Sequence, residues 1–520
     1  MIGVGGTGAK LTHALLHLSA AGLVDGDLYC LLVDADGNNG NGNECSEVRA
    51  VYEKCKGLKI GGAKTRLFSS EVTLDGPWKP AENDSAKKLG EFFHYSQKKG
   101  SRDNKYSLEA DLLELLYDKQ ELEEIDIAQG FRGRPAIGAA IFAERIDFKE
   151  PGQSWYKLIE QIRHAAGANS KVPVLFAGSI FGGTGAAGVP TIFQVARKEI
   201  VGERGDSTQR ADAATPEQKD SAAAPSGRMG MTLMLPYFTF EKVPGEAVQA
   251  DPSTFPEASV EALTYYHERQ FLGVANSMYA LGEVEPAKMP VPQVGGKDQR
   301  NPAHFLELVA ALGAIRFFAG KGTADKQLSL AVRKEEKTLE WEDLPFHDPD
   351  ARKTQTARLK QMILFAVIFR YVYWPWIARE AADDAKLRRS SATIIRKQVI
   401  PYKVKGKDSE GKEGSREINS QDLKDDLGAV NEYLGRFLHW VQELCTSHPG
   451  VTTQLVNTSV FAGGWDEREF NRKGLFLGAG VKPSLGHILD SACEMKLPDD
   501  DRLQGTGYVI RALYDACNLY

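Results

Sequence analysis

The sequence has few of the residues that build disulfide frameworks or transition-metal sites. Its 520 residues include six cysteines and ten histidines, and no two cysteines form a CxxC pair. The histidines show neither HxH nor HExxH spacing, so we expect no site in which protein side chains alone hold a metal ion. Free thiols of this kind are typical of a reducing compartment, which predicts a cytoplasmic protein.

The sequence also lacks a clear membrane span and an excess of basic residues. No uninterrupted apolar stretch approaches the roughly 20 residues that a spanning helix needs. The most apolar segment, 362–376, contains Arg370 and Pro375. The formal net charge is -6, so the composition predicts no nucleic-acid partner. With 42% hydrophobic residues and this length, we expect a globular chain of two or three domains.

What the sequence does contain is one five-residue motif twice. Gly-Gly-Thr-Gly-Ala occupies residues 5–9 and recurs at residues 182–186. Each copy follows an apolar run and leads into a helical pattern of apolar residues. A glycine loop between a strand and a helix lets the backbone approach an anion, and the helix start adds free N–H groups and partial positive charge. Two such loops predict one phosphate-bearing ligand held from two sides.

The two loops and the acidic segment after the second predicted strand supply the candidate site residues. Backbone amides of the loops would bind phosphate, with threonine hydroxyls as further donors. These candidates are Gly5, Gly6, Thr7, Gly8, Gly182, Gly183, Thr184 and Gly185. Asp34 and Asp36 are candidate ligands of a hydrated Mg²⁺, which prefers few carboxylates plus phosphate oxygens and water. Lys10 is either a further phosphate ligand or a surface lysine.

Strand and helix patterns alternate over the first 280 or so residues. Only Met1 and Ile2 precede Gly3, so we expect either a very short first strand or a start upstream of Met1. A glycine- and asparagine-rich segment, 34–43, is predicted to be loop. The alternation predicts a doubly wound, mainly parallel α/β sheet, in which ligands bind at the carboxyl ends of the strands. The predicted elements are helix 9–22, strand 27–33, helix 153–166, strand 172–177, strand 229–240, helix 257–272 and strand 277–283.

Two common nucleotide-binding motifs can be compared with these loops. Gly3, Gly5 and Gly8 fit the G-x-G-x-x-G fingerprint of dinucleotide-binding domains, with Asp34 as the acid for a ribose hydroxyl. An NAD-dependent oxidoreductase therefore stays open as an alternative, although it leaves the second loop unexplained. Neither loop has the Gly-Lys-Ser/Thr ending of a P-loop, which excludes that motif.

Taken in order, the loops resemble the tubulin/FtsZ superfamily, and most closely its bacterial tubulin-like proteins. Residues 3–8 resemble the family's first glycine loop, and 34–36 with Asn38 resemble its second loop, whose acid lies near magnesium. Residues 130–138 resemble the third loop, which caps the terminal phosphate. Residues 182–188 are similar to the signature GGGTG[ST]G, although Ile180 and Phe181 precede a pair of glycines where the family has three.

Further positions carry the resemblance toward the ribose and the base. Pro236 and Glu241 bound a segment that resembles the loop beside the ribose, and Asn301 resembles the residue that reads the guanine edge. In the third loop, Arg132 and Arg134, with Gly133 between them, are candidate ligands of the γ-phosphate; the alternative is that these arginines lie in a solvated turn. The family needs an acid after the core helix to activate water, and the corresponding stretch, 321–326, offers Asp325 alone. Asp325 is therefore the candidate catalytic residue, in an atypical catalytic loop.

The resemblance implies a fold, a ligand and a mode of assembly. It implies a nucleotide-binding, GTPase-like domain over 1–300 with insertions at about 43–129 and 202–228, a core helix over 301–320, and a second α+β domain over 321–520. The ligands would be GTP or GDP with Mg²⁺, and copies of the chain would stack head to tail into filaments, completing each active site. A protein encoded in the same operon is a further partner class. The alternative within this fold is a nucleotide-binding switch or adaptor that does not polymerise.

In the second domain the patterns predict both helices and strands. Residues 402–420 are charged and rich in glycine, which predicts a mobile loop. The other predicted elements are strands at 328–333 and 338–342, helices at 353–373, 421–445 and 484–495, and a glycine-rich β-like region at 451–480.

Overall fold

The computed structural model describes most of the chain. The described residues are 1–60, 66–81, 88–127, 131, 134–166, 171–201, 227–241, 251–289, 296–320, 340–344, 349–390, 393, 395–399, 403–407, 413–446, 455–476, 484–495 and 506–518. The candidates Arg132, Gly133 and Asp325 lie outside them, as do the predicted strand 328–333 and nearly all of the predicted insertion 202–228.

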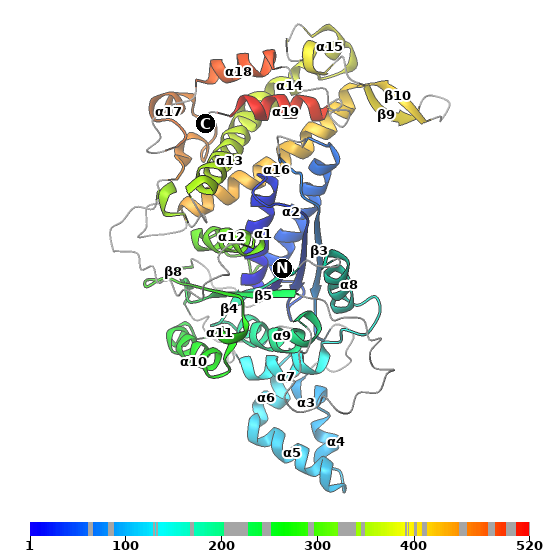
Figure 1. Ribbon diagram of the computed structural model, residues 1–520, viewed down its shortest axis with the longest axis vertical. Helices are drawn as coiled ribbons and strands as arrows, with labels where there is room; N and C mark the ends of the chain where they lie inside the picture. The colour runs from blue at the N-terminus through cyan, green and yellow to red at the C-terminus, as the bar shows by residue number, and fades with distance from the viewer. Residues whose placement is uncertain are drawn as a thin grey trace.

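A six-stranded parallel sheet forms the centre of the molecule (Figure 1). Its strand order is β3-β2-β1-β4-β5-β7, and every neighbouring pair is parallel. The strands are β1 (Ile2–Val4), β2 (Leu28–Val33), β3 (Val72–Trp78), β4 (Val172–Ser179), β5 (Gly227–Met234) and β7 (Ser277–Leu281). The prediction of an α/β fold with a mainly parallel sheet is confirmed at this level.

Helices cover both faces of the sheet and give it two cores. Along β2, Cys30 and Leu32 belong to one hydrophobic cluster and Leu31 and Val33 to the other, because successive side chains of a strand point to opposite faces. One face carries α1 (Gly5–Ala20), α2 (Gly40–Gly57) and α12 (Phe305–Phe318). The other carries α7 (Pro135–Arg145), α8 (Ser154–Ala166), α9 (Gly183–Val201), α10 (Phe255–Glu268) and α11 (Phe271–Val274).

The winding of the chain reverses between β1 and β4. From β1 the chain proceeds through α1 to β2 and β3 on one side, and from β4 it proceeds through α9 to β5 and β7 on the other. Val4 at the end of β1 lies in register with Gly178 near the end of β4. In open α/β sheets such a reversal opens a crevice at the carboxyl ends of the strands. Here both predicted glycine loops leave the sheet at that point.

The C-terminal part of the chain packs on the α1 side of the sheet. The long helix α16 (Ser420–Thr446) is amphipathic and buries Tyr433, Phe437 and Trp440. These three rings surround His17 of α1, with ring centroids 4.9 to 5.6 Å apart. Figure 1 shows α16 lying across α1 and α2. This aromatic contact joins the C-terminal helices to the helix that begins at the first glycine loop.

Apart from α16, the described elements of the C-terminal part are mostly helical. They are the 3-10 turns η4 (Trp341–Asp343) and η7 (Thr458–Val460), the π-helical segments η5 (Phe369–Tyr373) and η6 (Ile395–Val399), the hairpin β9 (Lys403–Lys407) and β10 (Glu413–Glu417), and the helices α13 (Pro349–Ile368), α14 (Trp374–Glu380), α15 (Asp384–Arg389), α17 (Glu467–Lys473), α18 (Leu485–Glu494) and α19 (Thr506–Ala516). The irregular turn at η5 precedes Pro375, which has no N–H to donate to the preceding helical turn.

One helical stretch among the described residues, Arg352–Glu380, is long and apolar enough to cross a membrane by length and composition. Inside this protein 56% of its apolar window is buried, and Phe365 and Phe369 lie in the larger hydrophobic cluster. The burial is consistent with a core helix of a soluble protein.

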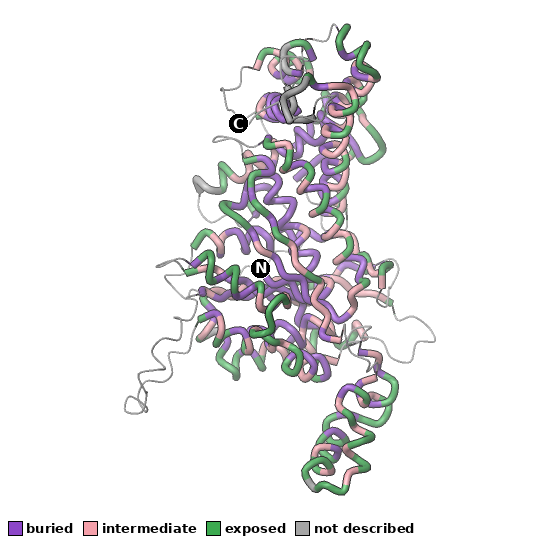
Figure 2. The backbone as a smooth tube through the Cα atoms, turned by 90° about the vertical axis from the view of Figure 1, so that its right-hand side faces the viewer, coloured by how far each residue is buried: buried purple, intermediate pink, exposed green. Residues whose placement is uncertain are grey.

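A helical arm, residues 88–127, projects from the end of the molecule opposite to the C-terminal helices (Figures 1 and 2). A β-bridge between Lys88 and Asp126 closes its base. The arm consists of α3 (Leu89–Phe92), α4 (Tyr95–Lys99), α5 (Asn104–Leu116) and α6 (Lys119–Glu124). The remaining short elements near the sheet are β6 (Phe238–Thr239), β8 (Ala287–Lys288), which pairs with it, and the 3-10 turn η3 (Pro252–Thr254).

Some sequence predictions near the sheet are wrong. The segment 34–43 is not all loop, because Asn39 accepts a hydrogen bond from the Asn41 N–H and α2 begins at Gly40. The predicted insertion 43–129 contains most of α2 and all of β3, so part of it belongs to the central fold and only the arm extends from it. Asn301 does not open a helix, since His304 is the N-cap of α12 in a capping box with Glu307.

Three predictions in the C-terminal part are also wrong. The segment 402–420 is not simply a loop, because it forms the hairpin of β9 and β10, whose glycine and charged residues concealed the strand pattern. The described end of the predicted strand 338–342 is the 3-10 turn η4. The described part of 451–480 holds η7 and α17. Helices 421–445 and 484–495 are confirmed as α16 and α18.

Gly8 gives a test of how closely α1 packs on the sheet. A Cβ at this position would lie 2.4 Å from the Gly3 carbonyl carbon and 2.8 Å from the Ala177 oxygen, both backbone atoms. We expect Gly8→Ala to lower the free energy of unfolding by roughly 2–4 kcal/mol, because helix and strand must move apart. Gly57→Ala is the matched control, since nothing lies within 4 Å of a Cβ there. Urea unfolding followed by circular dichroism measures both, and equal effects contradict the close packing.

Candidate functional site

The two glycine loops lie side by side at the junction of β1 and β4. Gly5 starts α1 with φ +70°, and a Cβ placed on it would lie 3.4 Å from both the Thr184 Cβ and the Gly185 nitrogen. The prediction that residues near 5 and near 184 lie together is thus confirmed. Neither α1 nor α9 has an acidic residue in its first turn. Two helix N-termini, with their partial positive charges, therefore converge on one place.

Some glycines of the loops are needed for close packing of the backbone. A Cβ on Gly3 would lie 2.7 Å from the Gly8 oxygen, and one on Gly185 would lie 2.4 Å from the Ser179 oxygen. These contacts bring the first turns of α1 and α9 directly against the ends of β1 and β4. Gly3, Gly8 and Gly185 thus hold the loops in place rather than leaving room for a ligand.

Around two other loop glycines the nearest neighbours are polar side chains rather than backbone. A Cβ on Gly6 would have the amide nitrogens of Asn39 and Asn41 as its nearest neighbours, each at 3.0 Å. A Cβ on Gly182 would meet the Ser179 hydroxyl at 3.0 Å. Gly183 begins α9 and is half-buried. An anion that approaches the backbone at Gly6 or Gly182 would therefore also meet side-chain hydrogen-bond donors.

A small pocket opens beside the first loop, between the strand ends and the start of α2. It is lined by backbone of the loop and by the acidic segment that follows β2. Its lining residues are Gly3, Gly5, Ala9, Leu32, Val33, Asp34, Asp36, Gly37, Asn39, Gly42 and Pro77. The sequence candidates from β1 and β2 thus come together around one cavity.

Asp34 lies between the two loops. It is 8% exposed, and its carboxylate accepts hydrogen bonds from the Asp36 N–H at 3.2 Å and from the Thr184 hydroxyl. Burial raises the pKa of Asp34 from 3.8 to about 7, and the neighbouring Asp36 charge adds to the shift, whereas the hydrogen bonds oppose it. A divalent cation at this carboxyl would favour its ionised form.

Asp36 serves mainly to fasten a covering segment, which we call the strap (residues 296–301). Its carboxylate accepts hydrogen bonds from the Gly296 N–H at 2.5 Å and from the Asn38 N–H at 3.0 Å. Asn39 donates to the Gln299 side chain at 2.9 Å. The Gly40 N–H donates to the Gly296 oxygen at 3.1 Å. The strap therefore closes over the start of α2 through several hydrogen bonds.

The structure separates two asparagine candidates from their predicted positions. Asn38 is exposed, and its neighbour Asn39 is the buried residue that lines the pocket. Asn301 lies at the end of the strap, where its backbone N–H donates to the Asn41 side chain at 3.2 Å. Asn301 is thus next to α2, although it does not begin α12.

Lys10 and Thr7 belong to a buried polar cluster that lies across the first loop from the pocket. The Lys10 ammonium lies 2.6 Å from the Glu307 carboxylate and donates to the Pro302 oxygen at 2.7 Å. Tyr237 donates to the same carboxylate at 2.9 Å and also bonds the Thr7 hydroxyl. Lys10 is neither a surface lysine nor directed at the pocket, so both sequence interpretations of it are wrong.

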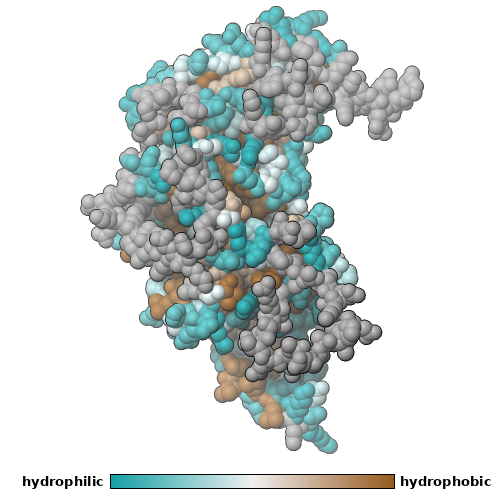
Figure 3. Space-filling view, viewed as in Figure 1, coloured by the Kyte–Doolittle hydropathy of each residue, from teal (hydrophilic) through white to brown (hydrophobic). Residues whose placement is uncertain are grey.

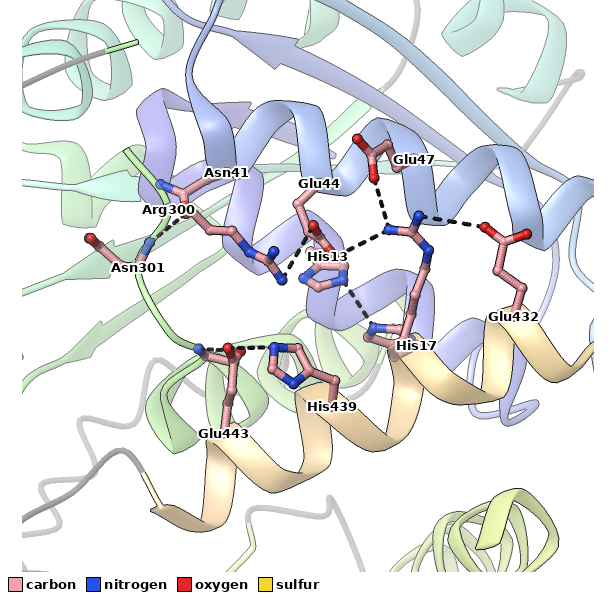
Figure 4. A network of polar contacts seen from close by, with 12 residues as sticks. His13, His17, Asn41, Glu44, Glu47, Arg300, Asn301, Glu432, His439 and Glu443 are labelled. Atoms are coloured by element: carbon pink, nitrogen blue, oxygen red, sulfur yellow. Dashed lines mark hydrogen bonds and ion pairs between the residues drawn. The ribbon is translucent and has the colours of Figure 1, made fainter. Parts of the chain in front are cut away.

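The strap is connected to α16 by a network of charged side chains (Figure 4). Arg300 of the strap and Arg436 of α16 both approach Glu44 of α2, at 3.4 and 3.5 Å. Arg436 also pairs with Glu47 at 2.9 Å and with Glu432 at 3.5 Å. Much of this network is exposed to solvent, so each pair contributes little to stability on its own. Together the contacts set the position of the strap relative to the C-terminal helices.

A histidine pair on α1 lies beside this network. His13 and His17 approach to 3.0 Å between their Nε2 atoms, and His17 Nδ1 lies 3.0 Å from the Tyr433 hydroxyl. Burial lowers the pKa of His13 to about 3, with Arg300 and other cations adding to the shift. Both rings are therefore neutral at physiological pH, one donating to the other. They link α1 to α16 without a buried charge.

The remaining candidates lie farther from the pocket. Pro236 follows β5, and its oxygen accepts a hydrogen bond from the Glu283 N–H at 2.9 Å. Glu241 is exposed and pairs with Lys288 at 2.6 Å. In the described part of the chain, no three His, Cys, Asp or Glu side chains gather in a metal-binding cluster. Any magnesium would thus depend on one or two carboxylates and on the phosphate itself.

Sequence reasoning missed three features of the site. Asn39 could have been found, because asparagine is a preferred N-cap immediately before the first residue of a helix. Glu307 could also have been found from its capping-box spacing after position 304. The strap had no signal, since its contacts with Asp36 and Asn39 join segments about 260 residues apart.

Comparisons with protein-family models, with curated proteins and with solved structures found no match to this chain. The loops and the geometry of the site are therefore the basis on which a function can be inferred.

The raised pKa of Asp34 predicts a pH-dependent stability. Because the folded protein binds this proton more tightly than the unfolded chain, stability of the ligand-free protein falls as pH rises from about 4 to about 7. Asp34→Asn removes this dependence. We expect the variant to exceed the parent by roughly 1–3 kcal/mol at pH 8 and to match it near pH 4. Urea unfolding across this range measures the difference, and a constant difference contradicts the assignment.

The buried pair of Lys10 and Glu307 predicts strong coupling between the two positions. Lys10→Met leaves a buried carboxylate without its cation, so we expect a loss of roughly 3–5 kcal/mol in the free energy of unfolding. Glu307→Gln in the same chain should recover part of this loss, with a coupling energy of roughly 1–3 kcal/mol in a double-mutant cycle. Additive effects would show that the two side chains do not depend on each other.

Proposed function

We propose that this protein binds a nucleoside phosphate with Mg²⁺ where the two glycine loops converge. The observation that carries the proposal is the contact of Gly5 with Thr184 and Gly185 at the reversal point of the sheet. Two helix N-termini without acidic residues offer backbone donors to one polyphosphate from two sides. Gly6, Gly182 and Gly183 would take the closest approach.

The acidic segment supports a magnesium ion beside the phosphates. The donor set of Asp34 and Asp36 suits Mg²⁺, which keeps waters and needs only one or two protein carboxylates. Asp34 is the better placed of the two, because it lies between the loops and its pKa near 7 lets it ionise when a cation arrives. Asp36 would hold the strap and complete the outer shell of contacts.

The proposed base and activity follow from the resemblance to tubulin-like proteins. We propose GTP as the nucleotide and head-to-tail stacking of copies as the arrangement that completes hydrolysis, with Asp325 as the water-activating acid. The order of the loops along the chain supports this proposal. A switch or adaptor that binds GTP without polymerising is the alternative within the same fold.

NAD binding is the second candidate, because the strand order β3-β2-β1-β4-β5-β7 is that of dinucleotide-binding domains as well. In that fold the acid after the second strand binds a ribose hydroxyl. Here the corresponding residue, Asp34, hydrogen-bonds Thr184 of the second loop. A carboxyl between two phosphate loops favours a metal-bound mononucleotide over a ribose contact.

Identification of the bound nucleotide tests the proposal directly. Protein purified in Mg²⁺ is denatured, and the released small molecules are separated by ion-exchange chromatography. We expect GTP or GDP in the parent and at least tenfold weaker binding in Gly6→Val, whose side chain fills the approach to the first turn of α1. Gly57→Ala, on the far end of α2, should bind like the parent. Release of NAD, or no preference between guanine nucleotides and NAD in titrations, contradicts the proposal.

Assembly needs a separate measurement. Turnover of GTP per molecule is followed against protein concentration, together with sedimentation in GTP and in GDP. Turnover that rises with concentration supports completion of the site by a neighbouring copy. Binding with a constant turnover and no sedimentation supports the switch or adaptor instead.

A further inference from the structure

The helical arm (residues 88–127) has an interior of its own. On α5, Ala110 and Leu113 are buried, and Tyr117 just after the helix is buried as well. Tyr117 stacks on Phe93 at 5.9 Å between ring centroids. Two ion pairs, from Lys98 to Glu109 at 3.0 Å and from Lys99 to Glu114, hold α4 against α5. One face of α5 is thus fully used inside the arm.

The opposite face of α5 is a stripe of exposed leucines. Leu108 is 67% exposed, Leu112 53%, Leu115 81% and Leu116 60%. Their spacing of four, seven and eight residues places them on one side of a helix. We call these four residues the leucine stripe. A face of this kind is costly to leave in water unless something covers it.

The stripe is unusual within the described part of the chain. Nine large hydrophobic side chains are strongly exposed there, and five of them lie on α5; the other four are scattered over Val201, Val260, Tyr265 and Val284. Figure 3 shows a hydrophobic patch at the lower end of the molecule, where Figure 1 places α5, in addition to smaller patches elsewhere on this face. The stripe is therefore accessible at one end of the molecule.

Charge is arranged with opposite signs at the two ends of the stripe. At its start two exposed bases, Arg102 and Lys105, stand against one acid, Asp103, which caps α5. Beyond its end, the segment 118–124 has Asp118 and three glutamates against one base of its own, Lys119, and one of these glutamates, Glu121, pairs with Arg134. A second α5 laid antiparallel would place each basic end beside the acidic end of the other copy. Antiparallel helices also bring opposite ends of their dipoles together.

We propose that two copies of this chain pair through the leucine stripes of their α5 helices, antiparallel about a two-fold axis near Leu112. Such an isologous contact is self-complementary, because the same stripe on each copy packs against the stripe of the other copy. The four leucines offer on the order of 500 Å² per copy, so the pair buries on the order of 1,000 Å². That area is at the lower limit for a specific interface, which predicts a dimer that dissociates on dilution. This pairing does not depend on the nucleotide.

The oligomeric state of the full chain without nucleotide tests the pairing. Analytical ultracentrifugation over a hundredfold range of concentration should show a monomer–dimer equilibrium in the parent. Leu112→Glu places two carboxylates together at the axis, and we expect at least a tenfold weaker dimer. Tyr106→Ser is the matched control, because it removes a 46% exposed ring from the same helix outside the stripe. Its dimer should be unchanged.

A cross-linking experiment tests whether a second copy covers the leucine stripe and whether the two α5 helices are antiparallel. Leu108→Cys and Leu116→Cys chains are mixed and oxidised at a concentration that favours the dimer. Antiparallel stripes predict disulfides between the two different variants in preference to pairs of either one alone. Preference for like pairs overturns the antiparallel arrangement.

Three results overturn the proposal as a whole. They are a parent that stays monomeric over the whole range, a dimer that Leu112→Glu leaves intact, and parent protein that leaves the dimer to bind phosphatidylcholine–phosphatidylglycerol vesicles. Nucleotide release from Leu112→Glu is measured alongside. Because the arm lies outside the candidate nucleotide site, we expect that release to match the parent, so that failure of the pairing is distinguishable from failure of the proposed function.

Discussion

The close contact between two strand ends and two helix starts is the constraint on which the site depends. At β1 the backbone of Gly3 touches that of Gly8, and at β4 the backbone of Ser179 touches Gly185, so α1 and α9 begin directly on the sheet. Side chains at these positions would push the helices away. Because β1 and β4 are neighbours with Val4 beside Gly178, this packing also brings the two loops together.

Two groups of polar contacts lie around that junction, one on each side of the first glycine loop. Asp34 reaches across from β2 to Thr184, and Asp36 holds the strap. On the far side of the first loop, Lys10, Tyr237 and Glu307 form a buried cluster that ties α1 to α12. Arg300 of the strap pairs with Glu44 of α2 (Figure 4), and Glu44 also lies 3.5 Å from Arg436 of α16, so the contacts continue to the C-terminal helices. A ligand that moves the strap would therefore act on the C-terminal helices through contiguous contacts.

The helical arm differs from the sheet in how much of its hydrophobic surface is buried. The sheet buries both of its faces, whereas the arm buries a few side chains of α3, α5 and α6 and leaves the leucine stripe of α5 in water. Its base is closed by the bridge between Lys88 and Asp126, so it stands as a unit at one end of the molecule. The chain thus separates the candidate ligand site at the sheet from the exposed leucine stripe on the arm.

Local features, which depend on neighbours along the chain, could be predicted from the sequence. Glycine-rich turns after apolar runs and the alternation of strands with helices predicted the parallel sheet, both loops and most helices, including α8 and α16. Elements whose pattern was masked by glycine, asparagine or charge were missed, as at the start of α2 and in the hairpin of β9 and β10. Only the tertiary structure decided which glycines pack against backbone and which against polar side chains, that Lys10 faces Glu307, and that the strap covers Asp36. These outcomes join segments up to about 300 residues apart, and the energy of burying a polar group depends on the partner that the fold brings to it.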